Sequence, residues 1–411
     1  MKRAYPMTIT LPGAAGAEVP AAIRAGDRVW LSGATALRGD SDVPADAYAQ
    51  ANLALDQLEA ALKAVGGSLA NITKLTTCIV DRGYRVGVYR AIAERIQGEA
   101  RPVSTGLVVA GLPDPALIVQ IDAEAVIPET PETATTYIRP YDYDKWFGQD
   151  FSWRGAMVAV TPDEFFVRGQ TGGALDHSGQ HVPGRSVTAA GELARLGMGT
   201  LRQLLEEAGG SLEDVTRINV YLSDRVYRQA IYPEIGKAFA AIHPCSTGIV
   251  TTAFAREDIL WEIDVVALRR KDGTPHKRSR KYHSGTAKYG TETQPLNCKF
   301  CMIIEAGNRV ILRGQTGMGL DEVLYGAGDV VAQTEKAMDN VVQLLGEAGA
   351  TLADVVKGVI YVTESDFIPL VNKAVVDRFG ETLPALTTVV VKGLASPELL
   401  MEIDITAVKA E

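Results

Sequence analysis

Apolar residues recur at helical spacing in the segment before Gly66, where Leu55, Leu58 and Leu62 fall on one face. This pattern predicts a helix that ends at the glycine, because glycine adopts the left-handed conformation after a helix without a Cβ clash. A β-rich run follows, then a second helix near residues 89–96 and two closing strands. This order favours an α+β unit, in which a mixed sheet carries two helices on one face.

The same unit occurs three times, with its markers in one order and at one spacing. The glycines that end the first helix lie about 140 residues apart, as do the prolines before one of the closing strands. These markers are Gly66, Gly209 and Gly349, and Pro102, Pro244 and Pro384. The hydroxyl residues just after the glycines are expected caps of a short turn; they are Ser68, Ser211 and Thr351.

We expect three domains, at residues 1–127, 136–268 and 282–411. A Pro/Thr-rich linker, residues 128–135, joins the first two, and a segment rich in Lys and Arg, residues 269–288, joins the last two. We interpret the basic segment as a solvated connector. A patch for single-stranded nucleic acid would need more aromatic side chains than Tyr282 alone.

Composition excludes several classes of protein. The chain has 411 residues, of which 46% are hydrophobic and 22% charged, and its net charge of −9 argues against binding to nucleic acid or anionic lipid. Apolar runs fall short of the ~20 residues that span a bilayer, and the N-terminus lacks the apolar core of a secretory signal. The four cysteines are too few for a disulfide scaffold. We therefore expect a cytoplasmic protein without nucleic-acid or membrane partners.

Three short motifs recur in each copy: G-[QA]-T after a strand, G-[GA]-[ST]-L after the first helix, and P-x-[SL]-T on the strand ahead of I-D-x-x-A. Together they resemble the Rid family (reactive intermediate deaminase, YjgF-like) along nearly the whole chain. The resemblance implies a chorismate-mutase-like fold, whose members assemble as trimers with ligand clefts between subunits. We therefore expect the three copies to form a pseudo-trimer, either as a monomer or as a homodimer of pseudo-trimers.

The resemblance also implies an activity. Rid deaminases hydrolyse enamines and imines, such as 2-aminoacrylate, to 2-oxoacids and ammonia, with no metal or organic cofactor. An arginine two residues after the proline holds the substrate carboxylate, and a glutamate on the last strand positions water or carries its proton. Here the arginine position holds Ser104, Ser246 and Leu386, and the glutamate position holds Gln120, Glu262 and Glu402.

Glu262 and Glu402 are the predicted catalytic residues. A carboxylate among apolar neighbours has a raised pKa and can carry protons near neutrality, whereas the alternative is a solvent-facing strand position. We expect Glu262 to be the stronger candidate, because its own copy also holds Ser246 and Thr247. The aspartates two residues further on are expected on the opposite face of the strand; they are Asp122, Asp264 and Asp404.

Arg168 and Arg313 precede a Gly-Gln pair, at the position where copy one has Ser32. Their side chains either rebuild the anion clamp inside a cleft or form salt bridges between domains. The predicted substrate-binding residues are Arg168, Arg313, Ser246, Thr247, Gly169, Gly314 and Ser104. A fused chain, unlike a homotrimer, can let individual clefts drift, so we expect one or two functional clefts, at least one of them involving copy two.

We predict no metal site. Cys298 and Cys301 form a lone CxxC, and a structural zinc needs two further ligands. His177 and His181 lie four residues apart in a Gly-rich loop rather than on a helix, and Cys245 is interpreted as a core thiol rather than a nucleophile. An aromatic cluster opens copy two and is interpreted as a first strand, from which one ring could line a cleft; it comprises Tyr141, Tyr143, Trp146, Phe147 and Trp153.

The leading hypothesis is a cofactor-independent hydrolase of the Rid type that acts on a C–N bond of a small, polar, anionic metabolite. One alternative is a metabolite-binding or regulatory protein that has kept the clefts and lost the chemistry. The missing arginine favours this alternative, and the retained glutamates favour the enzyme. A second alternative is a chorismatase-like enzyme, because such enzymes resemble the same fold and also fuse copies.

Overall fold

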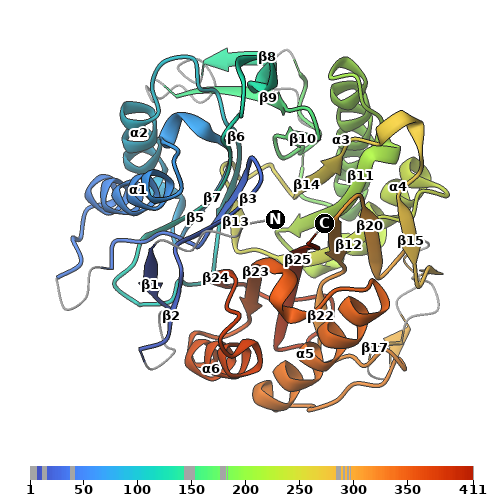
Figure 1. Ribbon diagram of the computed structural model, residues 1–411. Coiled ribbons are helices and arrows are strands. Elements are labelled where there is room, and N and C mark those ends of the chain that lie inside the picture. Colours follow the sequence, from blue (N-terminus) through green and yellow to red (C-terminus); the bar gives the residue numbers. More distant parts are fainter. Residues whose placement is uncertain are drawn as a thin grey trace.

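The computed structural model describes residues 7–11, 16–37, 42–142, 153–175, 182, 184–283, 288–289, 292–293, 296 and 298–410. Within these residues each copy has a pair of helices, and the three pairs form the outer layer of the molecule (Figure 1). They are α1 (Ala47–Ala64) and α2 (Arg85–Arg95), α3 (Val187–Glu207) and α4 (Arg228–Phe239), and α5 (Val330–Glu347) and α6 (Ile368–Phe379). Some residues singled out in the sequence lie outside the described residues, namely Tyr143, Trp146, Phe147, His177 and His181.

The first helix of each copy begins and ends where local chemistry favours it. Its N-cap side chain accepts a hydrogen bond from the first turn in every copy; the caps are Asp46, Ser186 and Asp329. The predicted stops are confirmed, because the glycines that follow have positive φ angles; they are Gly66, Gly209 and Gly349. The predicted turn caps are also confirmed as capping boxes, at Ser68, Ser211 and Thr351.

Each copy builds a mixed sheet with one common strand order, in which an N-terminal hairpin pairs with the last strand, and the last strand with a parallel pair. The first sheet has β3 (Ala22–Ala25), β4 (Arg28–Leu31), β7 (Val119–Val126), β5 (Ile72–Ile79) and β6 (Val103–Val108). The second has β8 (Thr136–Asp142), β9 (Arg154–Val160), β10 (Glu164–Val167), β14 (Trp261–Leu268), β11 (Val215–Leu222) and β12 (Cys245–Val250). The third has β15 (Lys277–Ser279), β20 (Ile303–Ala306), β21 (Arg309–Leu312), β25 (Met401–Val408), β23 (Val355–Val362) and β24 (Ala385–Val390), with β22 (Gln315–Thr316) also on β25.

Short strand pairs lie outside these sheets. They are β1 (Thr8–Thr10) with β2 (Glu18–Pro20), β16 (Tyr282–His283) with β19 (Lys299–Phe300), and β17 (Lys288–Tyr289) with β18 (Glu292–Thr293). The predicted α+β class is thus confirmed, with two helices on one face of each sheet. The domain limits drawn from the sequence stay a prediction; β15 lies ahead of residue 282 and pairs with β20 of the third sheet.

The last strand of each copy divides its side chains between two environments. In β14, Ile263 and Val265 pack in the core beneath the helices, whereas Glu262 and Asp264 lie on the other face of the sheet, where they are also buried. Residues two apart on a strand share a face, so the expected placement of the aspartates opposite the glutamates is wrong. This uncovered face is the one that meets the other copies.

The three copies form a closed ring with the sheets inside and the helices outside (Figure 1). Each sheet is extended at its parallel edge by backbone hydrogen bonds from a second copy. Thr252 N donates to Val108 O at 2.9 Å, and β13 (Ala253–Phe254) of copy two continues this pairing on β6. The equivalent bonds run from Val250 N to Gly393 O at 2.8 Å and from Val390 N to Gly111 O at 3.2 Å.

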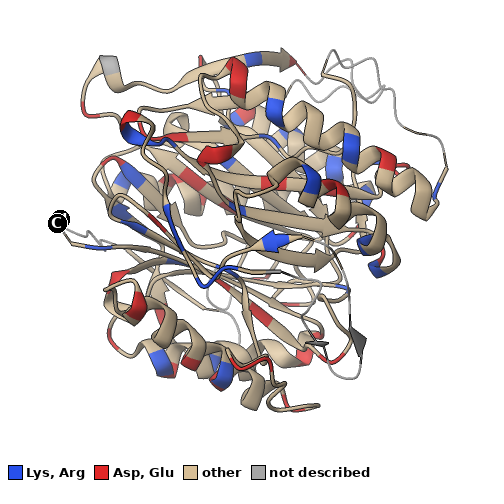
Figure 2. Ribbon diagram, turned by 90° about the vertical axis from the view of Figure 1, so that its right-hand side faces the viewer, with Lys and Arg blue, Asp and Glu red and all other residues tan. Residues whose placement is uncertain are grey.

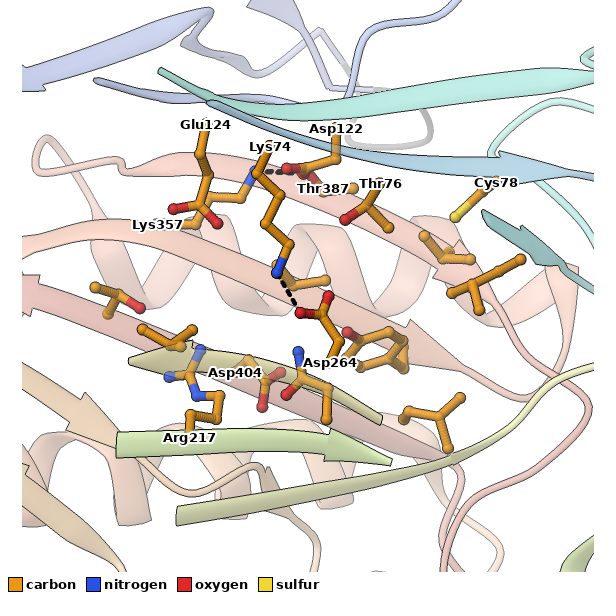
Figure 3. Close-up of a pocket in the computed structure, with 18 of the residues that line it drawn as sticks. Lys74, Thr76, Cys78, Asp122, Glu124, Arg217, Asp264, Lys357, Thr387 and Asp404 are labelled. Atoms are coloured by element: carbon orange, nitrogen blue, oxygen red, sulfur yellow. Dashed lines mark hydrogen bonds and ion pairs between the residues drawn. The ribbon is translucent and has the colours of Figure 1, made fainter. Parts of the chain in front are cut away.

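A buried contact repeats at each of the three interfaces along the axis of the ring. Thr105 of copy one donates to Asp264 of copy two at 3.1 Å. Lys74 of copy one pairs with the same carboxylate at 2.5 Å (Figure 3). The pattern recurs where Thr387 and Lys357 of copy three meet Asp122 of copy one. Where copies two and three meet, Thr247 donates to Asp404, but the basic residue is Arg217, which donates to the carbonyls of Leu312 and Ile405. The charged residues of these contacts line an axial cavity of about 90 Å³; they are Lys74, Asp122, Arg217, Asp264, Lys357 and Asp404.

At one end of the axis, three equivalent strand-start positions hold different charges. Arg28 of copy one donates to Glu164 of copy two at 3.2 Å, and Arg309 of copy three pairs with the same carboxylate at 2.5 Å. All three side chains are largely buried. A homotrimer would place three like charges here, whereas the fused chain places a carboxylate between two guanidinium groups.

The basic segment between copies two and three is only in part the solvated connector expected from its composition, because residues 271–275 and Lys277 are exposed. Three of its arginines instead contact copy two: Arg270 pairs with Asp214 at 3.2 Å, Arg278 donates to the carbonyl oxygen of Val215 at 3.1 Å, and Arg269 lies 4.3 Å from the ring centre of Phe165. Figure 2 shows Lys and Arg interspersed with Asp and Glu along the outer helices. No helix among the described residues has the length and apolar character to cross a membrane.

Glu164→Gln is expected to lower the thermal unfolding midpoint strongly, because it removes the carboxylate between Arg28 and Arg309. Arg28 keeps its second partner, Glu124, at 2.6 Å, whereas Arg309 loses the ion pair that holds it in this cluster. Breaking a buried ion pair costs about 3–5 kcal/mol. Glu192→Gln is the matched control, since Glu192 forms an exposed helical pair with Arg195, which contributes only about 0–1 kcal/mol. Differential scanning calorimetry of the variants measures both; similar midpoints would contradict a role for this cluster in holding the ring.

Candidate functional site

A pocket opens between copies two and three, and we call it cleft 2–3. Copy three contributes Glu402 and Arg313, and copy two contributes Ser246 and Arg228. The remaining lining residues are Tyr232, Gly248, Tyr282, Leu296, Phe300, Thr316, Ala395 and Leu399. The pocket leaves about 30 Å³ for the centres of water-sized molecules, so it suits a small ligand held by a few polar groups between aromatic walls.

Glu402 lies on β25 and is 5% exposed. A Cβ at Gly314 would collide with its carboxylate oxygen, so the glycine of the Gly-Gln-Thr motif makes room for this side chain. Burial, together with the charge of Asp404, raises the pKa of Glu402 to about 8, although Arg313 and Arg228 lower it. The carboxyl group is therefore mostly protonated at neutral pH and can donate a proton.

Two guanidinium groups face this acid. Arg313 lies over the ring of Tyr282, 5.1 Å from its centre. Arg228 begins α4 and lies 4.6 Å from the ring centre of Tyr232, and a Cβ at Gly248 would crowd its Nη1. Each arginine is thus oriented by an aromatic ring of its own copy, and the pocket presents positive charge beside a neutral acid.

Part of this constellation recurs at the equivalent interface between copies one and two, which we call cleft 1–2 for its place in the ring. Glu262 lies against Gly169 as Glu402 does against Gly314, and burial raises its pKa to about 8, with Arg168 lowering it. Arg168 stacks over Tyr141 at 5.4 Å, as Arg313 does over Tyr282. On the side of copy one, Tyr89 lies within hydrogen-bonding distance of Ser104, at 3.3 Å.

An aromatic edge contact is also shared by the two clefts. Tyr89 meets Trp153 of the next copy at 6.2 Å between ring centres, and Tyr232 meets Phe300 at the same distance. One ring of the aromatic cluster, Trp153, therefore contacts a residue of the interface, in line with the sequence interpretation. Cleft 1–2 and cleft 2–3 are two versions of one arrangement.

The third interface, cleft 3–1, has lost this arrangement. Gly33 N donates to Leu386 O at 3.2 Å, and Leu386 N donates to the Ser32 hydroxyl at 2.9 Å, so the two backbones meet directly. Gln120 replaces the glutamate. Other equivalent positions have changed as well: Ile368 stands for Arg228, Asn372 for Tyr232 and Thr388 for Gly248. Thr388 donates to Asn372 at 2.7 Å, so the two polar side chains that stand at these positions in copy three hydrogen-bond to each other.

The structure pairs the predicted residues differently from the sequence analysis. Ser246 shares a cleft with Glu402 and not with Glu262, because each cleft takes its acid from one copy and its hydroxyl from the preceding one. The ranking of Glu262 above Glu402 on the basis of Ser246 and Thr247 is therefore wrong. Thr247 donates to Asp404 at the axis. Leu386 and Gln120 lie at the same interface, cleft 3–1, so the loss of the serine and the loss of the glutamate affect one cleft.

Sequence reasoning missed Arg228 and Tyr232. Both belong to a stretch that reads D-R-V-Y-R-x-x-x-Y in copy two and D-R-G-Y-R-x-x-x-Y in copy one, and that is absent from copy three. A pattern that is kept in copies one and two and lost in copy three, as the serine is, was the available signal.

Among the described residues, no group of three or more His, Cys, Asp or Glu side chains is placed to hold a metal ion. The four cysteines are buried. Cys245 lies next to Ser246 in β12, with its Sγ 3.9 Å from that of Cys301, and burial raises its pKa well above the usual range. This is the environment of a core thiol rather than of a nucleophile.

Comparisons with known proteins agree with this geometry. The family model "Endoribonuclease L-PSP" matches residues 8–127 and 292–409, more than half of the chain. A RutC family protein of Pyrococcus abyssi is 31% identical over 110 residues, which are 27% of this chain and 86% of that protein. A 2-iminobutanoate/2-iminopropanoate deaminase of Dermatophagoides farinae is 29% identical over 96 residues, 23% of this chain and 74% of the relative.

A likeness in fold extends over the three copies. The crystal structure of a chorismatase superposes with a TM-score of 0.55 and covers 82% of this chain and 93% of its own, at 17% identity. At this identity the match concerns the fold alone.

The double variant Glu262→Gln, Glu402→Gln is expected to stabilise the protein at alkaline pH. An acid whose pKa rises from 4.5 to about 8 on folding binds more protons in the folded state, so stability falls as pH rises between these values. Each pKa unit corresponds to about 1.4 kcal/mol. The variant should melt close to the wild type at pH 5 and above it at pH 8.5. An identical pH dependence of the two melting curves would show that the acids are not buried as described.

Proposed function

Because the chain belongs to the Endoribonuclease L-PSP family, which includes the Rid proteins, we propose that it hydrolyses the C–N bond of small imino or enamino acids in clefts 1–2 and 2–3. The observation that carries this proposal is a buried glutamic acid, protonated near neutrality, beside arginine in each of two clefts. One relative is named as a deaminase of 2-iminobutanoate and 2-iminopropanoate. No metal or organic cofactor is needed for this chemistry.

In cleft 2–3, the reaction begins with the proton of Glu402. The carboxyl group protonates the enamine carbon or the imine nitrogen, which makes C2 electrophilic. The resulting carboxylate is stabilised by Arg313 and Arg228 and accepts a proton from water as the C2–O bond forms and the C=N π bond opens. Glu402 then returns the proton to nitrogen. As the C–N bond breaks and ammonia leaves, the Glu402 carboxylate accepts the proton of the new hydroxyl group, which forms the 2-oxoacid and regenerates the acid.

The substrate carboxylate needs a cationic partner, because the family arginine after the proline is replaced by Ser104 and Ser246. Arg168 and Arg313 supply a guanidinium group from the strand of the opposing copy. The fork of an arginine suits a carboxylate, and stacking on Tyr141 or Tyr282 fixes its plane. The serine hydroxyl, where the family arginine would lie, can hydrogen-bond a polar group of the substrate.

A binding protein without catalysis is the alternative, and the lost arginine favours it. Chorismatase-like chemistry has the likeness in fold alone to support it. Measuring the ammonia and 2-oxoacid released after a fixed reaction time distinguishes an enzyme from a binding protein.

The chain is expected to release ammonia and 2-oxobutanoate from 2-iminobutanoate generated in solution, faster than the spontaneous reaction. Glu262→Gln and Glu402→Gln should each remove the share of one cleft, and the double variant should lose about 10²–10⁴-fold in rate. Since the protonated acid starts the reaction, the rate should fall as pH rises through about 8.

Gln120→Ala is the matched control, because Gln120 occupies the equivalent position in cleft 3–1, and it should leave the rate unchanged. Equal losses from the three single variants would contradict the assignment of two working clefts. A rate no greater than the spontaneous one, in a chain that still binds 2-oxobutanoate, would favour the binding protein.

A further inference from the structure

Cleft 2–3 differs from its counterpart in how its second arginine is paired. Arg228 is 4% exposed, and its Nε and Nη1 atoms have no hydrogen-bond partner among the described residues. Burying donors of a charged group without an acceptor is costly, and such groups are normally paired. The side chain lines the pocket, so an acceptor that enters the pocket can meet it.

Neighbouring charges do not neutralise this guanidinium group. No carboxylate within 4.0 Å pairs with it among the described residues. Glu402 is nearby but is mostly protonated at neutral pH, and Arg225, on the preceding turn, has its pKa lowered by burial and by the charge of Arg228. With Arg313, the pocket carries two cations and no ionised acid at pH 7.

The position of Arg228 has a different environment in each copy, so the three copies can be compared. In cleft 1–2 the residue is Arg85, and its Nη1 donates to the carbonyl of Ala255 at 2.8 Å. In copy three the residue is Ile368, a buried core side chain. In cleft 1–2, Arg85 therefore donates to a backbone carbonyl, whereas in cleft 2–3 two donor atoms of Arg228 have no acceptor among the described residues and are available to a ligand.

Geometry also separates the two arginines of cleft 2–3. Arg313 belongs to copy three and stacks on Tyr282, whereas Arg228 belongs to copy two and stacks on Tyr232. Stacking covers one face of each guanidinium plane, and a carboxylate binds such a group along its N–H edge, where Nε and Nη1 of Arg228 have no partner among the described residues. The walls between them are aromatic and aliphatic, with Phe300, Leu296 and Leu399, so they suit a short carbon chain.

We propose that cleft 2–3 binds a small dicarboxylate, one carboxylate on Arg313 and the other on Arg228, and that cleft 1–2 lacks this preference for a dianion. If cleft 2–3 also catalyses the proposed hydrolysis, its substrate is a short imino or enamino dicarboxylate; this statement about the substrate rests on the proposed function. Two working clefts in one chain then accept substrates of different charge.

The experiment compares succinate with succinamate, which have the same length and differ by one carboxylate, by isothermal titration calorimetry of the full chain at pH 7 in chloride buffer. Succinate is expected to bind at least tenfold more tightly. Arg228→Met should bring the two affinities together, and Arg228→Lys, which keeps the charge without the fork, should retain part of the difference. Arg85→Met, at the equivalent position of cleft 1–2, should retain all of it.

Equal affinities in the wild type, or a preference for succinate that survives Arg228→Met, would overturn the inference. If Arg228→Met does not fold, as judged by its melting curve, the comparison between the wild type and Arg228→Lys decides, and full retention by the lysine variant counts against the bidentate contact. These titrations need no turnover, so they separate the inference from the proposed hydrolysis.

Inhibition of turnover tests independently which cleft binds the dicarboxylate. Succinate should inhibit hydrolysis of 2-iminobutanoate by Glu262→Gln, in which only cleft 2–3 works. It should inhibit Glu402→Gln at least tenfold less. Equal inhibition of the two variants would place the dicarboxylate elsewhere.

Discussion

Helices cover each of the three sheets on one face only, and the other face carries buried polar side chains that neither the helices nor water satisfy. On β14 this face presents Glu262 and Asp264. Burying charged groups requires partners, and the partners come from the next copy, as Lys74 and Thr105 do for Asp264. The ring is therefore a requirement of the sheet and not an optional assembly of finished domains.

The clefts follow from the same constraint. The edge of one sheet, with Ser246 and Arg228, is placed against the last strand of the next, with Glu402. The acid is taken from water by the very packing that closes the ring, and this raises its pKa. The raised pKa of Glu402 thus depends on an interface between copies. Neither neighbour contains all the residues of the pocket, which explains why Ser246 and Glu402 share it although they lie more than 150 positions apart in the sequence.

Fusion into one chain allows equivalent positions to differ, and the structure uses this freedom at the axis and in the clefts. Arg28, Glu164 and Arg309 form an ion cluster that three identical subunits could not form. Lys74 and Lys357 hold aspartates, whereas Arg217 bonds to backbone carbonyls instead. Small departures from threefold symmetry are thus stabilised by pairing unlike side chains.

Much of the fold could be predicted from the sequence, because its signals are local. Helix ends at Gly66 and capping boxes at Ser68 depend on residues within a few positions of each other. The repeat then predicted the ring. The site could be predicted only in part: Glu402 and Arg313 were found by motif, but their partners depend on which copy follows which in space. Spacing along one copy suggested that Ser246 serves Glu262, and the order of the ring contradicts this.

The basic segment was in part misjudged, for a related reason. Composition predicts solvation, but Arg270 and Arg278 find acceptors on copy two once the chain folds back along its sheet. Arg228 was missed because an arginine at the start of a helix looks like any surface residue in the sequence. Its burial depends on Gly248, a neighbour only in three dimensions.

The direct backbone contact between Gly33 and Leu386 lies where the ring has no covalent connection. Connectors tie copy one to copy two and copy two to copy three, but the seam between copies three and one has no covalent link. At this seam the ligand space is filled by protein. Hydrogen bonds between the two backbones therefore close the circle where no connector does, while a pocket opens at the tethered seam between copies two and three.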